Sequence, residues 1–284
     1  MKKVKQTDPK QNIRIGGGAG FSGDRIDAAV ELAARGGIDY LVLECLAERT
    51  VALGNLKKIR EPDKGYSDTL PERVRSLLPV CLPRNICVVA NMGAANPAAA
   101  ARYTCNVAEE LGFPGLKVAT VLGDDVLDII RKRPDLELLE TGDRLESILP
   151  KVISANAYLG ADAILPAFET GLPVILTGRV ADPSLFIAPL IHEFGWSYDD
   201  YPLLAQGTLA GHLLECAGQL TGGYFADPGV KDVTGLSRLG FPFADVTDTG
   251  QVTLGKTPDT GGILDVRTCT EQLLYEIHNP AEYI

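Results

Sequence analysis

The sequence has few of the residues that build metal centres and disulfides. Its three histidines, His192, His212 and His278, lie too far apart for a local zinc-binding motif. His192 and His212 lie in apolar segments, where we expect structural roles. The six cysteines show no C-x-x-C spacing and are expected to be reduced thiols. These absences exclude a histidine-rich metal centre and indicate a cytoplasmic protein.

Long apolar runs and clustered positive charge are also lacking. No segment approaches the roughly 18 consecutive apolar residues of a membrane span, and the polar start of the chain lacks the core of a signal peptide. The formal net charge of −10, without a basic stripe, excludes a phosphate-backbone partner. No G-x-S-x-G elbow, P-loop or catalytic cysteine motif is present. We therefore expect no membrane or nucleic-acid partner and no serine or cysteine nucleophile.

What the chain does contain is a regular alternation of apolar strands and helices. Apolar residues make up 45% of its 284 residues, enough for a sizeable core. Nearly all-apolar short runs are typical of parallel strands covered on both faces. We predict strands near residues 13–19, 39–46, 86–92, 117–122, 150–158 and 173–178. The fold class is therefore α/β, a mostly parallel sheet with helices on both faces, followed by a smaller α+β C-terminal segment.

Three regions follow from this pattern. Residues 1–12 are predicted to be a flexible tail and residues 13–220 the α/β domain. Residues 221–284 are predicted to be an α+β extension with a hairpin over 243–256 and a strand near 261–268. A capping box of Thr268 and Glu271 would begin a last helix. Because the chain stops without a polar ending, we expect the natural protein to continue beyond it.

A glycine-rich stretch links the first strand to the first helix. Gly18, Gly20 and Gly23 fit G-x-G-x-x-G, the spacing that lets a backbone approach a pyrophosphate. Glu44 follows about 20 residues later, where an acid would hold a ribose hydroxyl. Asp24, next to the third glycine, would instead repel a pyrophosphate. An NAD(P)-binding oxidoreductase is therefore an alternative hypothesis.

Polar residues gather where the predicted strands end. Because ligands of open parallel sheets bind at the carboxyl ends of the strands, these residues define a candidate site. Arginines there can hold a carboxylate or phosphate, acids can move protons and amides can orient carbonyls. We assign Glu44, Glu48 and Asp182 to catalysis, and Gly18, Gly20, Gly23, Asp24, Arg25, Asn91, Asn96, Asn156 and Arg179 to ligand binding.

Each assignment has a simpler alternative. Asp24, Asn96 and Asp182 precede helices and could serve only as N-caps. The arginines could simply pair with neighbouring carboxylates. Glu44 and Glu48 could share a divalent cation, although two carboxylates alone are a weak metal motif. No metal ligand is assigned, and the sequence leaves open no cofactor, a divalent cation or NAD(P).

Several short motifs together resemble one known family. The motifs are Gly20-Phe-Ser-Gly-Asp-Arg25, Leu46-Ala-Glu-Arg-Thr50, Lys64-Gly-Tyr-Ser-Asp68, Asn91-Met-Gly-Ala-Ala-Asn-Pro97, Ser154-Ala-Asn-Ala-Tyr-Leu-Gly160, Thr177-Gly-Arg-Val-Ala-Asp182, Gly222-Gly-Tyr-Phe225 and Gln272-Leu-Leu-Tyr-Glu-Ile277. The combination resembles the acyclic terpene utilisation family, encoded beside geranyl-CoA carboxylase genes. Where this family often has Asp-Tyr, the chain has Glu44-Cys45.

The resemblance implies a cytosolic protein of bacterial type, linked by name to citronellol and geraniol breakdown. It implies no established reaction or catalytic residue, and family members usually exceed 284 residues. Our leading hypothesis is an enzyme with lyase- or hydratase-like acid–base chemistry on a small carboxylate or acyl-CoA. A non-catalytic subunit that docks through residues 221–284 is a further alternative, and a homo-oligomer is left open.

Overall fold

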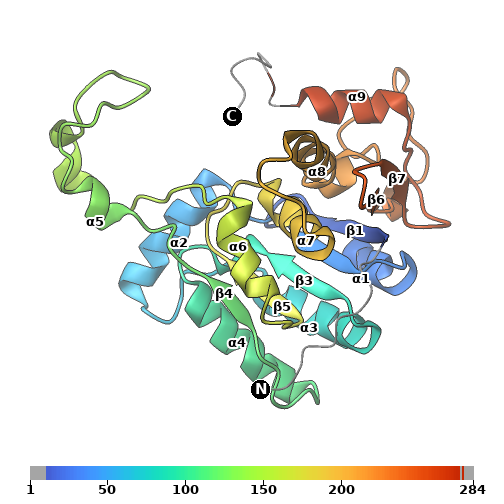
Figure 1. Ribbon diagram of the computed structural model, residues 1–284, viewed down its shortest axis with the longest axis horizontal. Coiled ribbons are helices and arrows are strands. Elements are labelled where there is room, and N and C mark those ends of the chain that lie inside the picture. Colours follow the sequence, from blue (N-terminus) through green and yellow to red (C-terminus); the bar gives the residue numbers. More distant parts are fainter. Residues whose placement is uncertain (1–10, 276, 278–284) are drawn as a thin grey trace.

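The computed structural model describes residues 11–275 and 277, and within them seven strands form one sheet. The sheet order is β4-β5-β3-β2-β1-β6-β7. The strands are β1 (Asn12–Ala19), β2 (Tyr40–Leu43), β3 (Cys87–Ala90), β4 (Ala119–Val121), β5 (Val174–Thr177), β6 (Pro242–Thr247) and β7 (Val252–Lys256). The first five strands pair in parallel, whereas β6 and β7 are antiparallel. The predicted mostly parallel sheet is therefore confirmed (Figure 1).

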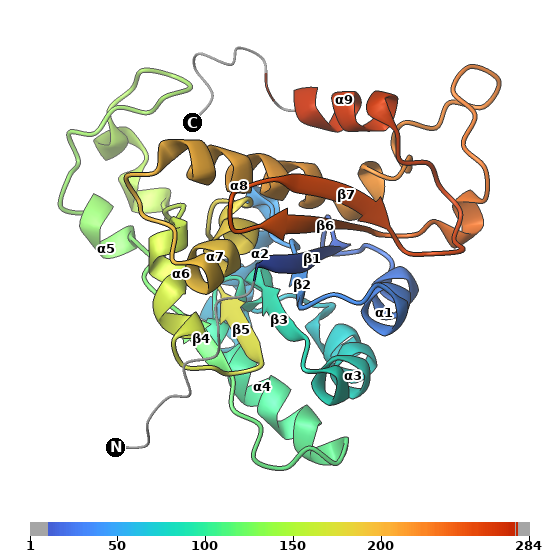
Figure 2. The same ribbon diagram turned by 45° about the vertical axis from the view of Figure 1, so that its right-hand side comes forward.

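Helices cover both faces of this sheet, as the alternation in the sequence predicts. They are α1 (Ile26–Arg35), α2 (Glu48–Arg60), α3 (Leu70–Cys81), α4 (Pro97–Glu110), α5 (Leu127–Ile130), α6 (Ala161–Phe168), α7 (Ser184–Phe194), α8 (Tyr201–Leu214) and α9 (Val266–Leu274). Helices α1, α3 and α4 contribute to the core on one face, and α6, α7 and α8 to the core on the other. Helix α9 packs outside α8 (Figure 2).

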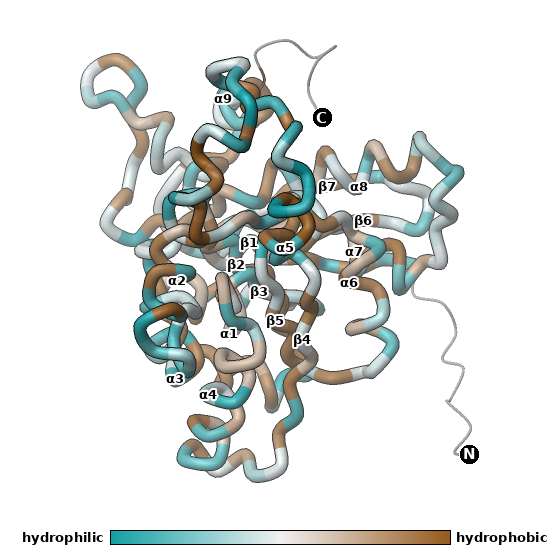
Figure 3. The backbone as a smooth tube through the Cα atoms, turned by 90° about the vertical axis from the view of Figure 1, so that its left-hand side faces the viewer, coloured by the Kyte–Doolittle hydropathy of each residue, from teal (hydrophilic) through white to brown (hydrophobic). Residues whose placement is uncertain are grey.

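The central strands are apolar because both of their faces are buried. Leu41 belongs to the core on the α1 face, whereas its neighbour Val42 belongs to the core on the α7 face. Successive side chains of a strand point to opposite faces, so a doubly covered strand needs apolar residues at every position. The same hydrophobic character marks β4 and β5 (Figure 3).

The C-terminal hairpin extends this sheet. Strand β6 pairs with β1, and Ile15 lies opposite Ala244. Arg14 of β1 and Asp245 of β6 form an ion pair of 2.7 Å across the two strands. The predicted hairpin is therefore confirmed. The strand predicted over 261–268 is wrong, because Gly261 makes only an isolated bridge to Leu239.

The strand predicted over 150–158 is also wrong. This stretch begins in a 3-10 turn (Leu149–Lys151), and Asn156 makes one isolated bridge to Asp125. It is the last part of an arm, residues 122–158, that extends away from the rest of the molecule (Figure 1). Leu139 in the arm is 95% exposed. Its apolar residues therefore lack the neighbouring strand that a sheet position requires.

The helix starts confirm one of the predicted caps. Asn96 caps α4, with its Oδ1 accepting from the amide of Ala99 at 3.3 Å. Helix α1 instead has Arg25 at its N-cap position, and Asp24 precedes it. Helix α7 has Pro183 at its N-cap position, so Asp182 is not the cap. The predictions of Asp24 and Asp182 as N-caps are wrong because both carboxylates have other partners.

The capping box at the start of α9 is formed by a different pair of residues from the predicted pair. Asp265 is the N-cap, and its side chain accepts from the amides of Arg267 and Thr268. Thr268 returns a bond to the Asp265 amide, which completes the capping box. The predicted box of Thr268 with Glu271 is wrong, because the helix begins at Val266.

No helix within the described part of the chain is both long and apolar enough to cross a lipid bilayer.

Candidate functional site

A cavity of about 390 Å³ lies at the carboxyl ends of β2 and β5. The loop after β1, the start of α2, the loop between β5 and α7 and the end of α8 all contribute to its wall. It is lined by Gly20, Phe21, Glu44, Leu46, Ala47, Glu48, Tyr158, Arg179, Asp182, Glu215, Cys216, Tyr224 and Tyr275. The structure thus brings together Gly20 and four of the predicted charged residues at the expected edge of the sheet.

Glu44 is a buried carboxyl held in one orientation. It follows β2 and is 8% exposed. Its Oε1 accepts from the amide of Leu46 at 2.9 Å and from Nδ2 of Asn91 at 2.8 Å. Asn91 in turn accepts from the amide of Cys45 at 2.7 Å, so this predicted ligand-binding residue positions Glu44. Burial raises the pKa of Glu44, which suits a group that exchanges a proton near neutral pH.

Arg179 is the cation of the cavity and is almost fully buried. One guanidinium nitrogen donates to the carbonyl of Leu46, and another donates to Oδ1 of Asp182 at 2.6 Å. The guanidinium also lies over the ring of Tyr158, 4.2 Å from its centroid. Its Nε has no hydrogen-bond partner among the described residues. A cation fixed by two partners and retaining an N–H is suited to an anionic or carbonyl oxygen.

Glu48 and Tyr158 form the rim of the cavity. The Tyr158 hydroxyl donates to Oε1 of Glu48, the first residue of α2. This bond lowers the pKa of Glu48, whereas burial and Glu48 raise the pKa of Tyr158 to about 12. Glu48 is therefore ionised at neutral pH. No cluster of three or more potential ligands that could hold a metal occurs within residues 11–275 and 277.

The cavity also contains Glu215, which the sequence analysis did not assign to the site, and Glu215 bonds to His212, for which a structural role was expected. Glu215 follows α8, lines the cavity and is 5% exposed. His212 is 3% exposed, and its Nδ1 lies 3.1 Å from Oε1 of Glu215. This hydrogen bond raises the pKa of His212. The available indication was a histidine and a glutamate three residues apart on an apolar helix, a spacing that places them on one face.

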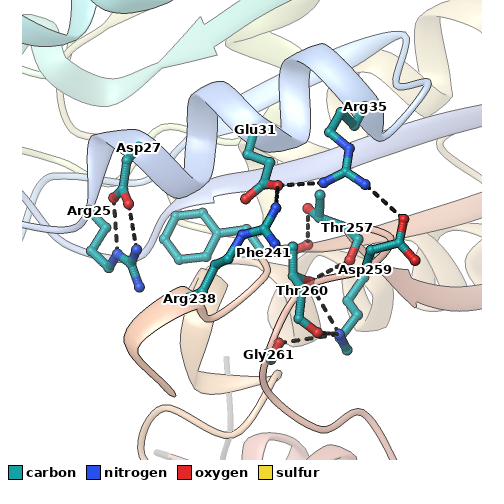
Figure 4. Close-up of polar contacts among 11 residues, drawn as sticks. Arg25, Asp27, Glu31, Arg35, Arg238, Phe241, Thr257, Asp259, Thr260 and Gly261 are labelled. Atoms are coloured by element: carbon teal, nitrogen blue, oxygen red, sulfur yellow. Dashed lines mark hydrogen bonds and ion pairs between the residues drawn. The ribbon is translucent and has the colours of Figure 1, made fainter. Parts of the chain in front are cut away.

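Three predicted ligand-binding residues have partners away from the cavity. Arg25 pairs with Asp27 at 2.5 Å on the outer side of α1 (Figure 4). Asn96 caps α4 and donates to backbone carbonyls of the loop after α2. Asn156 donates to Oδ2 of Asp124 at 2.8 Å. None of the three lines the cavity.

The glycine-rich stretch serves close packing. Gly18 lies within β1, where an added Cβ would be 2.6 Å from a methyl group of Leu41. At Gly20 the added Cβ would be 2.5 Å from the carbonyl carbon of Cys216. The Gly20 amide donates to Oδ2 of Asp24 at 2.9 Å, and burial raises the pKa of that carboxyl. A dinucleotide-binding loop would offer this amide to a pyrophosphate, whereas here the amide is bonded to Asp24. Gly23 lies in the open turn just before Asp24.

These features define an α/β protein with an acid-lined cavity, containing one buried arginine, at the carboxyl edge of a mostly parallel sheet. The chain belongs to the acyclic terpene utilisation family: the sequence model for the acyclic terpene utilisation family protein AtuA matches residues 13–284. No curated protein and no solved structure matches the chain. The resemblance inferred from the motifs is thereby confirmed over nearly the whole sequence.

Proposed function

We propose that this protein is an enzyme that performs acid–base chemistry on a small carboxylate or acyl-CoA of terpenoid or branched-chain catabolism. The observation that carries the proposal is the presence of Glu44 and Arg179 in one cavity. The first is a buried carboxyl with a raised pKa, and the second is an immobilised cation. The family's link to acyclic terpenes favours the substrate class.

The two residues have complementary roles in this proposal. Arg179 binds the carboxylate or the thioester carbonyl of the substrate and stabilises negative charge that develops there. Glu44 transfers a proton to or from the neighbouring carbon or oxygen, a contribution of about 10²- to 10⁴-fold in rate. Asn91 and Asp182 keep these two side chains in place.

The rest of the cavity wall suits an apolar chain. Phe21, Tyr224 and Tyr275 supply aromatic surface next to the charged groups. Small-molecule sites commonly combine such apolar walls with a few convergent polar groups. A branched hydrocarbon would therefore lie against the aromatic side chains while its acyl end contacts Arg179.

A thermal-shift screen of short branched carboxylates and acyl-CoA thioesters tests this proposal. Ligand at 100 times its Kd stabilises the folded state by about 2.7 kcal/mol, which raises the Tm by several degrees. Arg179→Lys keeps the charge but loses the planar fork, so we expect this shift to disappear. Glu193→Gln is the matched control, because Glu193 bonds to Tyr40 at the opposite edge of the sheet. Equal shifts in wild type and Arg179→Lys would contradict the proposed site.

A further inference from the structure

A second buried carboxylate accompanies Glu44 in the cavity. Glu215 comes from the end of α8, whereas Glu44 comes from the end of β2. Both line the cavity and both are less than a tenth exposed. Carboxylates at such depth require a specific partner, because desolvation disfavours their charged form.

Glu215 has that partner in His212. The ring Nδ1 lies 3.1 Å from Oε1 of Glu215. The backbone of Gln272 and Leu273 in α9 contributes further to raising the pKa of His212. Gln272 further donates from Nε2 to the carbonyl of His212 at 2.9 Å. His212 is therefore held between α8 and α9, with its ring beside the carboxylate of Glu215.

Within residues 11–275 and 277, Glu44 forms no ion pair with a lysine, arginine or histidine. Its hydrogen bonds come from the amide of Leu46 and from Asn91. The nearby cation, Arg179, is paired with Asp182. The negative charge of Glu215 adds to burial in raising the pKa of Glu44, and Arg179 acts in the opposite sense. The other charged groups of the cavity, Glu48 at the start of α2 and Asp182 after β5, are both acidic. Two neighbouring carboxyls in such a setting favour retention of one proton between them.

We infer that Glu215 and Glu44 form a two-carboxylate acid–base pair that adds water to, or removes it from, a carbon–carbon double bond conjugated to an acyl carbonyl. The inference rests on the proposed function and names its reaction and substrate class. A pair is needed because this reaction removes one proton and delivers another. Glu215, held by His212, is the base, and Glu44 is the acid.

The step balances without a further reactant. Ionised Glu215 takes a proton from water, and the water oxygen forms a bond to the β-carbon of the unsaturated acyl compound. The electron pair of the double bond moves towards the carbonyl, where Arg179 stabilises the negative charge. The α-carbon then takes the proton from Glu44. The product carries the elements of water, and one proton passes from Glu215 to Glu44 to restore the pair.

The first experiment measures the coupling of the two carboxyls without any substrate. A raised pKa in the folded state means that stability is present below the unfolded value and is lost as pH rises through the folded value. Wild type should therefore lose more Tm than Glu44→Gln between pH 5 and pH 8. This difference should shrink when both proteins carry Glu215→Gln. An unchanged difference in that background would overturn the pair, and Glu193→Gln should show no such dependence.

The second experiment measures the reaction itself with the CoA thioester of a 3-methyl-branched 2-enoic acid in D₂O. We expect hydration with one deuterium at the α-carbon, lowered at least about 100-fold by Glu215→Gln or Glu44→Gln and retained by Glu193→Gln. Full activity of Glu215→Gln would overturn its role as base. Absence of hydration by wild type would overturn the reaction class.

Binding and coupling measurements distinguish failure of the carboxyl pair from failure of the proposed function. If the thioester binds to wild type and not to Arg179→Lys, but the carboxyls are uncoupled, the inference fails and the proposed function stands. If the thioester and the free acids do not bind, the proposed function fails as well.

Discussion

At the scale of single residues, the local surroundings of Glu44 and Glu48 shift the pKa of each carboxyl. Burial raises the pKa of Glu44, against the opposing effect of its hydrogen bonds from Leu46 and Asn91. Glu48 accepts from Tyr158 at the rim, which lowers its pKa. Two glutamates four positions apart thus have pKa values shifted in opposite directions, because one follows a buried strand and the other starts a helix at the rim of the cavity. This divergence supports different roles for the two residues.

Gly20 provides a test of backbone packing next to the cavity. We expect Gly20→Ala to lower the Tm, because its Cβ would be 2.5 Å from the carbonyl carbon of Cys216 and the backbone must move. The cost should be about 1–3 kcal/mol, measured by chemical denaturation. Gly23→Ala is the control, since its nearest neighbour is a ring carbon of Phe21 at 3.4 Å. Equal stability of the two variants would contradict this packing role.

The sequence identifies some site residues and misses others for physical reasons. Glu44 was recognisable because an acid at the end of an apolar strand needs a reason to be there. Glu215 was not, because its position beside Glu44 depends on how α8 packs against β1, a contact between distant segments. Arg25 looked equivalent to Arg179 in sequence, yet it pairs with Asp27 on the outer side of α1.

At the scale of elements, charged side chains join α1 to the segment before and after the C-terminal hairpin. Glu31 pairs with Arg35 at 2.5 Å and with Arg238 at 2.6 Å (Figure 4). Arg35 also pairs with Asp259 at 2.9 Å. Glu31 links Arg35 of its own helix to Arg238 before the hairpin, and Arg35 in turn reaches Asp259 after it.

We expect Glu31→Gln to lower stability by at most about 1 kcal/mol, because its partners are substantially exposed and screened by solvent. The loss should diminish in high salt, which thermal unfolding at two ionic strengths can measure. Glu72→Gln, on α3, is a control outside the network. A large loss that is independent of salt would contradict an electrostatic role.

Element prediction from sequence succeeded where an element pairs with neighbours in the sheet. The five parallel strands are largely apolar and buried, and the two strands of the hairpin pair around a turn. It failed over 150–158 and 261–268, where similar residues occur without a neighbouring strand. Local patterns record what a segment can bury, whereas strand pairing depends on what lies next to it.

At the scale of the whole molecule, the arm of residues 122–158 stands apart from the two cores. It contains one short helix, α5, and several exposed apolar side chains. Segments with few buried contacts open at low free-energy cost.

Among the described residues, we therefore expect trypsin to cut first in the arm, after Arg131 or Lys132, under native conditions. Mass spectrometry of the first fragments gives the site directly. Arg35 lies within helix α1 and Arg179 is almost fully buried, so both should be cut only after unfolding. Initial cleavage at either residue would contradict the described order of stability.

The central claim is that Arg179 and Glu44 bind and act on an acyl substrate in one cavity. The most direct measurement is a calorimetric titration of the CoA thioester of a 3-methyl-branched 2-enoic acid, and of the free acid, into wild type, Arg179→Lys and Glu193→Gln. The account predicts saturable binding to wild type and Glu193→Gln, and a Kd at least about tenfold weaker for Arg179→Lys, a change of about 1.4 kcal/mol. Equal affinity for all three proteins, or no binding to wild type, would contradict it.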